Sequence, residues 1–282
     1  LYVGKLYAVA APPPPPSGYK TGMSNSKWGT RVECGAPQLM LRRGVTLIEL
    51  LVVFGVLAVL LAILTPVLGM VRSTAADTAS LSNIRQSTSG VIVHCESSSG
   101  LFPLGKSGSS NMSFMGQQRG ILLRLPDNSD YAMSWFGQTA YWPLILWSMG
   151  DEPAEAWWSP DAGNTALTPY RPSDYLLTQS VMAGPSYWER EASQDPASWR
   201  PMRYTDVVSP SRKGLLVEHP QRASMRWRTK APLQRASPVS FVDGHARLLR
   251  LTDATPPVAN TWQGDSKMPV IHTERGVLGH DY

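Results

Sequence analysis

VTLIELLVVFGVLAVLLAILTPVLGMV, residues 45–71, is a stretch of 27 residues in which Glu49 is the only charged side chain. At a rise of 1.5 Å per residue, a helix of this length spans about 40 Å, which exceeds the roughly 30 Å of a hydrocarbon core. We therefore predict one transmembrane helix. The main alternative, a secretory signal peptide, is disfavoured because such a peptide has a shorter apolar core that ends in small residues.

The charge distribution indicates how this helix is oriented. Residues 1–44 carry six basic residues and one acidic residue, so the whole net charge of +5 lies before Val45 and the remainder is balanced. Arg42 and Arg43 directly precede the apolar stretch, and the positive-inside bias places that end in the cytoplasm. We therefore expect everything after Leu68 to be extracytoplasmic, and the balanced charge there indicates no nucleic-acid partner.

Glu49 is the unusual residue of the apolar stretch, because an ionised carboxylate inside a membrane helix is costly and is usually kept for a purpose. A free amine at Val45, released by a cut after Gly44 and presented by a neighbouring subunit, would be a suitable positive partner. This interpretation makes the helix an assembly device. Pro66, 21 residues after Val45, predicts a kink or a local melting of the helix.

The segment Arg42-Arg43-Gly44-Val45-Thr46-Leu47-Ile48-Glu49 resembles the cleavage and methylation signature of type IV prepilins and type II secretion pseudopilins. In that family a membrane-embedded prepilin peptidase cuts after the glycine and methylates the new N-terminal residue. The glutamate at the fifth mature position pairs with the amine of an adjacent subunit. The resemblance implies these roles for Gly44, Val45 and Glu49, with Val45 in place of the usual Phe, and it implies an assembly role for Pro66.

The resemblance also implies an α+β, pilin-like fold in which a long N-terminal helix, transmembrane and then amphipathic, packs on a C-terminal antiparallel sheet. We divide the chain into a leader peptide (1–44), the transmembrane part of the helix (45–71), an amphipathic extracytoplasmic part (72–96) and a globular pilin-like domain (97–282). Apolar residues at spacings of three and four, from Leu68 to Cys95, support the amphipathic part. Short apolar runs at 120–123 and 141–147 leave the structure of residues 100–200 weakly determined.

The leader is unusual for this family because it contains five consecutive prolines, Pro12 to Pro16, and begins with Leu1. Residues 40–44 alone would form a complete short leader. We expect translation to start at Met40 or Met23, with residues 1–39 an artefact of the start site. The alternative is a genuine long polyproline leader.

Two segments of the last third indicate antiparallel sheet: residues 207–218, a turn followed by a strand, and residues 238–251, a β-hairpin with an Asp243-Gly244 turn. This stretch resembles the C-terminal region of large prepilin-like proteins, in which a histidine precedes Asp-Gly with nine residues between them. Leu233 occupies that position here. Some pseudopilins hold calcium in a C-terminal loop, so Asp243 and His245 are the candidate ligands, but we favour a turn-forming role and predict no cofactor.

Motifs for enzymatic chemistry are missing from the sequence. The five histidines are scattered, and there is neither a phosphate-binding Walker loop nor a Gly-rich dinucleotide fingerprint. Cys34 and Cys95 lie on opposite sides of Gly44, so a cut there separates them, and we interpret Cys95 as a small buried hydrophobic residue. We predict that the protein is not an enzyme.

Two functions remain open after these exclusions. In the first, the chain is a pseudopilin or minor pilin of a type II secretion or type IV pilus-like filament. In the second, it is a membrane-anchored module that binds DNA or polysaccharide and uses the helix only as an anchor. Five tryptophans are candidate sugar platforms and a basic run with Trp227 is a candidate DNA surface, although we favour core packing and a solvated loop, respectively. The candidates are Trp135, Trp142, Trp147, Trp157 and Trp158, and Arg222, Arg226, Arg228, Lys230 and Arg235.

We predict the first function. It implies a protein of the bacterial inner membrane that spans the bilayer once, has a periplasmic domain and can be extracted into a filament. The implied partners are prepilin peptidase, other pilin-like subunits contacted through the N-terminal helix, the inner-membrane assembly platform and the lipid bilayer.

Overall fold

The computed structural model describes residues 45–105, 120–151, 154–159, 170–219 and 236–282. The chain divides into two compact units, Leu1–Gly55 and Val56–Tyr282. The described part of the first unit is the beginning of helix α1 (Leu47–Ser97), and the rest of α1 belongs to the second unit. The whole predicted leader, residues 1–44 including Gly44, lies outside the described residues.

The first half of α1 has an apolar and exposed surface. By length and composition it is the one helix among the described residues that is able to cross a membrane, and no residue of its most apolar window is buried. Helical backbone continues through Pro66 without a break. A proline removes one backbone N–H from the helical ladder, and the neighbouring Thr65 hydroxyl donates to the Leu61 carbonyl at 2.7 Å on the same turn.

The second half of α1 packs into the globular domain through a face of small and polar side chains. Burial begins at Ser80, so Leu68 and Val71, which the apolar spacing assigned to this face, are exposed instead. Small side chains allow the backbone of the helix to approach the sheet closely, and their hydroxyls then need partners. The buried residues of α1 are Ser80, Ile84, Ser87, Thr88, Val91, His94 and Cys95.

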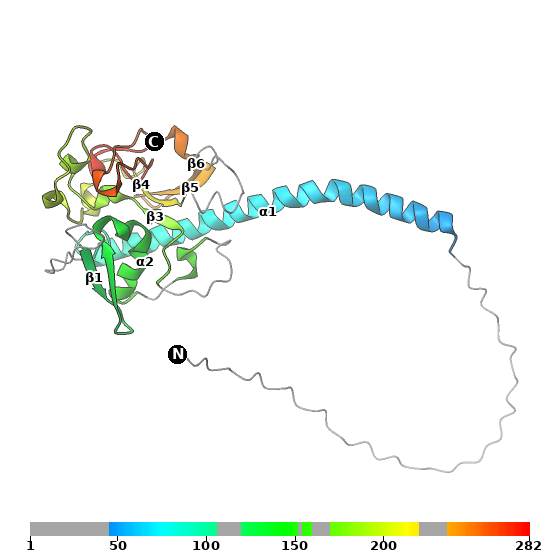
Figure 1. Cartoon of the computed structure of the whole chain (residues 1–282), viewed down its shortest axis with the longest axis horizontal. Coiled ribbons are helices and arrows are strands. Elements are labelled where there is room, and N and C mark those ends of the chain that lie inside the picture. Colours follow the sequence, from blue (N-terminus) through cyan, green and yellow to red (C-terminus); the bar gives the residue numbers. More distant parts are fainter. Residues whose placement is uncertain (1–44, 106–119, 152–153, 160–169, 220–235) are drawn as a thin grey trace, which may run out of the picture. The chain divides into compact units, whose positions relative to one another are not determined.

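Hydrogen bonds join the second half of α1 to a four-stranded antiparallel sheet. The sheet has the order β3 (Tyr175–Leu177), β4 (Gly214–Glu218), β5 (Ala236–Phe241) and β6 (Ala246–Arg250). Ser80 Oγ lies 3.0 Å from the Tyr175 hydroxyl of β3, and Thr88 Oγ1 donates to Ser240 Oγ of β5 at 2.5 Å. The Arg85 guanidinium donates to the Ala246 carbonyl of β6 at 3.1 Å. The predicted α+β fold, a long helix on a C-terminal antiparallel sheet, is confirmed (Figure 1).

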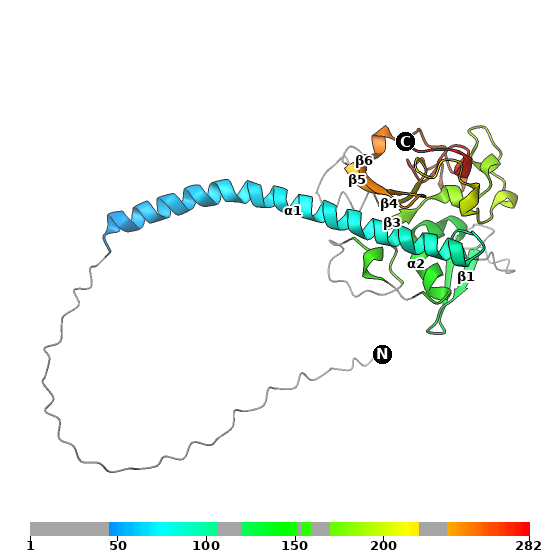
Figure 2. The ribbon, with the colours of Figure 1, turned by 180° about the vertical axis from the view of Figure 1, so that it is seen from behind.

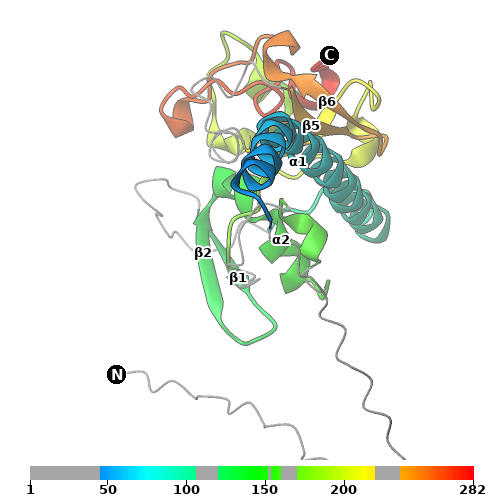
Figure 3. The same ribbon diagram turned by 90° about the vertical axis from the view of Figure 1, so that its right-hand side faces the viewer.

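Asn83 and Ser87 of α1 contact a second group of elements. Asn83 donates to the Trp158 carbonyl at 3.0 Å, and Ser87 donates to the Ala156 carbonyl at 2.8 Å. Here lie the antiparallel hairpin of β1 (Gly120–Arg124) and β2 (Asp130–Ser134) and the helix α2 (Gln138–Ser148). Figure 3 shows α1 between α2 on one side and β5 and β6 on the other.

Short 3-10 helices connect the main elements. They span Trp135–Gly137, Glu155–Trp157, Gln179–Val181, Pro185–Trp188, Pro196–Ser198, Tyr204–Asp206, Leu251–Asp253, Thr261–Gln263 and Gly276–Leu278.

The hairpin of β5 and β6 has a three-residue loop, Val242-Asp243-Gly244. The Phe241 amide donates to the His245 carbonyl and the Gly244 amide donates to the Phe241 carbonyl, both at 2.9 Å. Gly244 has φ +90°, in the left-handed region that a glycine adopts without a steric penalty. The hairpin therefore depends on the Asp-Gly pair that is visible in the sequence.

The sheet is covered on its other face by the C-terminal segment. Val217, Val239 and Phe241 form a second apolar cluster with Val270 and Ile271, so all five residues of β4 are buried. A strand covered on both faces is expected to be mostly apolar, as β4 is at Leu215, Leu216 and Val217, before it ends at the buried Glu218.

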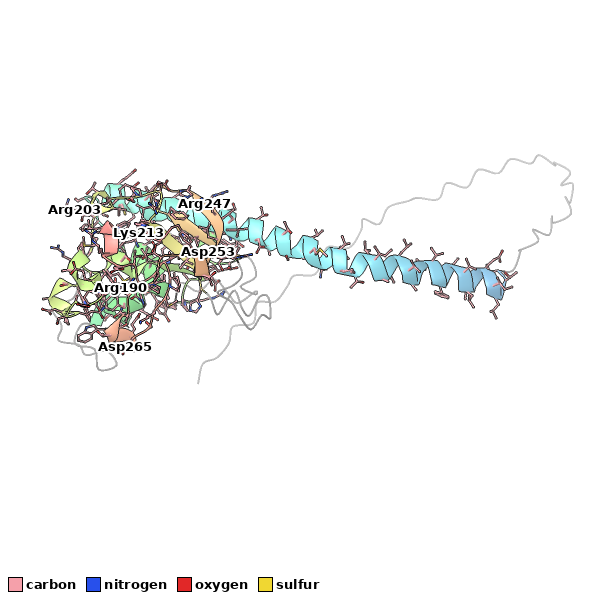
Figure 4. The ribbon with its side chains drawn as sticks, turned by 90° about the horizontal axis from the view of Figure 1, so that it is seen from above. Arg190, Arg203, Lys213, Arg247, Asp253 and Asp265 are labelled. Atoms are coloured by element: carbon pink, nitrogen blue, oxygen red, sulfur yellow. The ribbon has the colours of Figure 1, made fainter. Side chains whose placement is uncertain are left out.

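A buried ion pair between Lys213 and Asp281 holds the end of the chain beside this C-terminal segment. Lys213 and Asp281 have side chains 0% and 1% exposed, and Lys213 Nζ lies 3.0 Å from Asp281 Oδ2. The ammonium also donates to Ser180 Oγ at 3.0 Å and to Thr273 Oγ1, while Asp281 Oδ2 accepts from the Gly214 amide at 2.9 Å. Figure 4 labels Lys213 within the globular domain. Every polar atom of the pair thus has a partner, which a buried charge requires.

Asp281→Asn should destabilise the domain by about 3–5 kcal/mol, because it leaves the Lys213 ammonium buried without a counter-charge. Chemical denaturation of the detergent-solubilised chain measures the free energy of unfolding. Asp130→Asn is the matched control, since Asp130 pairs with Arg124 at an exposed position. Equal effects of the two substitutions would contradict a stabilising role for the buried pair.

A second stability effect comes from His272, which is fully buried and stacks on Trp188 with ring centroids 5.7 Å apart. Burial lowers the pKa of His272 from 6.5 to about 4. The unfolded chain therefore binds a proton between these pH values that the folded chain does not. The contribution of His272 to the stability of the folded state is therefore complete above pH 6.5 and is lost as the pH falls toward 4.

Lowering the pH from 7 to 4 should reduce the free energy of unfolding through His272 by at most about 3 kcal/mol. In His272→Phe, which keeps a ring against Trp188 but binds no proton, the decline should be smaller by that amount. Denaturation at several pH values measures both slopes, and parallel slopes would contradict the assignment.

Candidate assembly site at the start of α1

The first turn of α1 is closed by a reciprocal pair of contacts between Thr46 and Glu49. The Thr46 amide and hydroxyl both donate to Glu49 Oε2, at 2.8 and 3.0 Å, and the Glu49 amide donates to Thr46 Oγ1 at 3.2 Å. This is a capping box, in which an N-cap Thr and a Glu three residues later satisfy amides that the helix itself leaves open. Glu49 therefore has a partner within its own chain.

Thr46 was not predicted as that partner, although the sequence carries the signal for it. Thr46-Leu47-Ile48-Glu49 has the Thr-x-x-Glu spacing that marks a helix N-terminus. The same carboxylate that is a charge in an apolar helix is also a hydrogen-bond acceptor for the first turn. Of the residues assigned to processing and assembly, Gly44 is outside the described residues, and Val45, at the start of them, is 73% exposed.

After the capping box, α1 presents large apolar side chains on all sides. From Leu47 to Val71 these side chains are between 46% and 80% exposed. Such a surface is unfavourable in water and matches either a bilayer or the apolar flanks of other helices. Pro66 lies within this exposed part of α1.

The candidate metal ligands Asp243 and His245 contact each other in the hairpin loop. His245 Nδ1 lies 2.5 Å from Asp243 Oδ1, and the His245 ring stacks on Phe241 with centroids 4.2 Å apart. In the described part of the chain, no group of three or more histidine, cysteine, aspartate or glutamate side chains is placed to hold a metal ion. The contacts of Asp243 and His245 are those of a turn, and Leu233 lies outside the described residues.

Core packing accounts for most of the candidate sugar-binding tryptophans. Trp135, Trp142, Trp157 and Trp158 are at most 5% exposed and belong to the main apolar core, while Trp147 is only partly buried. The basic run 222–235 with Trp227 lies outside the described residues. Cys95 is buried, as interpreted, and burial raises the pKa of its thiol to about 12, so it is unreactive at neutral pH.

Comparison with known proteins identifies the N-terminal segment. Residues 39–65 match the family model described as the prokaryotic N-terminal methylation motif. No curated protein and no solved structure matches the chain significantly. The matched segment contains Gly44, the capping box and most of the exposed apolar part of α1.

The motif, the apolar helix and the sheet together define a class: membrane-anchored proteins that carry the prepilin methylation motif. The motif at residues 39–65 is consistent with a type IV pilin-like protein, and the α+β fold of a long N-terminal helix on a C-terminal antiparallel sheet agrees with it.

Thr46→Ala should loosen the first turn of α1, because it removes the acceptor for the Glu49 amide and one of the donors to its carboxylate. Amide hydrogen exchange at residues 47–50, in the chain reconstituted in lipid nanodiscs, should become severalfold faster. Thr46→Ser keeps both contacts and should resemble the unchanged protein. Thr74→Ala, outside the first turn, is the control, and equal exchange in all variants would contradict the capping role.

Proposed function

We propose that this chain is a structural subunit, a pseudopilin or minor pilin, of a type II secretion or type IV pilus-like filament. Prepilin peptidase cuts it after Gly44, and Val45 becomes the methylated N-terminus. The observation that carries the proposal is the methylation motif at residues 39–65, directly continued by an apolar helix that no described part of the chain covers.

The division of α1 into two halves supports a filament subunit. The second half belongs to the folded domain through its contacts with β3, β5 and β6. None of the described residues buries the most apolar window of the first half, so this half is available first to lipid and then to the helices of neighbouring subunits. Extraction from the inner membrane by an assembly platform exchanges one apolar environment for the other, with the domain remaining on the periplasmic side.

Burial of four candidate tryptophans weakens one form of the alternative, a polysaccharide-binding module that uses the helix only as an anchor. A sugar platform requires an exposed ring face, and these rings pack in the core. The proposed role requires positioning and assembly rather than chemistry by the chain itself.

Co-expression with an active prepilin peptidase should give a mature chain that begins at Val45 and is one methyl group heavier than its sequence mass. Intact-mass spectrometry and N-terminal sequencing measure both changes. Gly44→Leu should remain uncut. Gly55→Leu, a matched substitution on an open surface of α1 with no atom within 4 Å of the new Cβ, should be cut normally.

An uncut chain in the presence of active peptidase would overturn the proposal and leave a membrane-anchored domain. Glu49→Ala separates the two remaining functions among chains that are cut. A filament subunit should be processed but excluded from sheared or cross-linked filaments, whereas a simple anchor should behave as the unchanged protein does.

A further inference from the structure

Lys213 and Asp281 place an amine and a carboxyl group together in a site that excludes solvent. Their side chains are 0% and 1% exposed, and Ser180 and Thr273 beside them are buried as well. Lys213 directly precedes β4, and Figure 2 shows the C-terminal end of the chain near β4. The proposed filament role uses neither group, and a desolvated lysine amine is a nucleophile as well as a charge.

Burial disfavours the charged forms of the pair. It lowers the pKa of the Lys213 ammonium, and the Asp281 carboxylate opposes that shift. Two ions removed from water lose their hydration, and their mutual attraction recovers that cost only in part even when every polar atom has a partner. The site therefore favours a reaction between the two groups that removes both charges.

The two oxygens of the Asp281 carboxylate have different surroundings. Oδ2 accepts from the Gly214 amide at 2.9 Å and lies 3.0 Å from Lys213 Nζ. Oδ1 accepts from the Thr273 hydroxyl at 2.6 Å. A backbone amide directed at Oδ2 stabilises the negative charge that develops there when a nucleophile attacks the carboxyl carbon. Oδ1, next to a hydroxyl, is the oxygen positioned to receive protons.

The Thr273 hydroxyl connects the amine to Oδ1. Lys213 Nζ donates to Thr273 Oγ1, and Thr273 Oγ1 donates to Asp281 Oδ1, so this hydroxyl is able to pass protons from the nitrogen to the carboxyl oxygen. Nζ also donates to Ser180 Oγ at 3.0 Å, and the Asp281 amide donates to the Arg212 carbonyl at 2.9 Å. Both reacting groups are therefore held in place by the fold, which replaces the entropy cost of bringing them together.

We propose that Lys213 and Asp281 form an intramolecular amide bond in the folded domain, with Thr273 as the proton relay. The Thr273 hydroxyl passes one proton from the ammonium to Oδ1, and the lone pair of the neutral amine forms a bond to the carboxyl carbon. A second proton follows the same route, the bond between that carbon and Oδ1 breaks, and one water molecule leaves. The nitrogen keeps one hydrogen, and Oδ2 remains as the amide oxygen that accepts from the Gly214 amide.

The bond would join two segments that are 68 residues apart in the sequence. A covalent link of this kind restricts the unfolded chain, as a disulfide does, and so stabilises the folded domain. It would also fix the C-terminal segment against the sheet. The proposal is independent of the filament assignment, since it concerns the folded domain alone.

Mass spectrometry of the full chain, expressed without prepilin peptidase and denatured after purification, tests the bond. The intact mass should be lower than the sequence mass by one water molecule. Trypsin should release residues 213–222 joined to residues 276–282, because it does not cleave after an acylated lysine. Lys267, an exposed amine two residues from Asp265, is the internal control and should carry no link.

Thr273→Val removes the relay hydroxyl at nearly constant volume and should slow formation of the link by about a hundredfold. The linked fraction at increasing times after a pulse of expression measures this rate. Thr273→Ser keeps the hydroxyl and should link as the unchanged chain does. Thr255→Val is the matched control, because the Thr255 hydroxyl donates to the main-chain carbonyl of Asp281, at 3.2 Å, and not to its carboxylate.

An unchanged chain at its full sequence mass, without linked peptides, would overturn the proposal. A loss of water confined to the peptide that contains Asp243-Gly244 would also overturn it, because such a pair forms a cyclic imide without a lysine. Equal rates of linking in Thr273→Val and Thr255→Val would overturn the assignment of the relay. Since the chain in this experiment is uncut, its outcome is distinguishable from that of the test of cleavage after Gly44.

Discussion

A single helix has to satisfy two environments, and the rest of the structure follows from this constraint. Through Val71, α1 is apolar around its circumference, as a bilayer requires. From Ser80 onward the same helix is part of the folded domain and buries side chains against a sheet. The backbone continues without interruption between the two halves, so the change of environment is made entirely by the side chains.

The buried face of the second half determines how the domain is built. Ser80, Ser87 and Thr88 bring α1 close to its neighbours, and their hydroxyls are satisfied by β3, β5 and the 154–159 segment. α1 buries one face of the sheet, and the apolar side chains on the other face also have to be buried. Residues 270–281 pack against that face. Gly214 permits this close approach, because a Cβ there would collide with Val270. The Lys213–Asp281 pair then holds the cover in place.

Features that depend on local sequence were predictable, and those that depend on distant partners were not. The apolar stretch 45–71 and the Asp243-Gly244 turn are recognisable alone, because hydrophobicity and turn chemistry are local properties. The burial of Ser80 and Ser87 could not be recognised in this way. In the sequence, a serine at an interface cannot be told from a serine in solvent until its hydrogen-bond acceptor is known. Lys213 was missed for the same reason: its counter-charge is 68 residues away. The middle of the chain was weakly determined because α2 contains Pro143, which obscures a helical pattern.

Glu49 shows how one carboxylate serves both the monomer and, under the proposed function, the assembly. Both Thr46 donors bind the same oxygen, Oε2. Oε1 of that carboxylate is therefore left for another donor, and the amine of a processed neighbouring chain would supply both a donor and a counter-charge. Before assembly, the capping contacts offset part of the cost of holding a carboxylate in an apolar helix. After assembly, the positive charge of the neighbouring chain offsets the rest of that cost. The Glu49 carboxylate therefore favours assembly because its own chain stabilises its charge only in part.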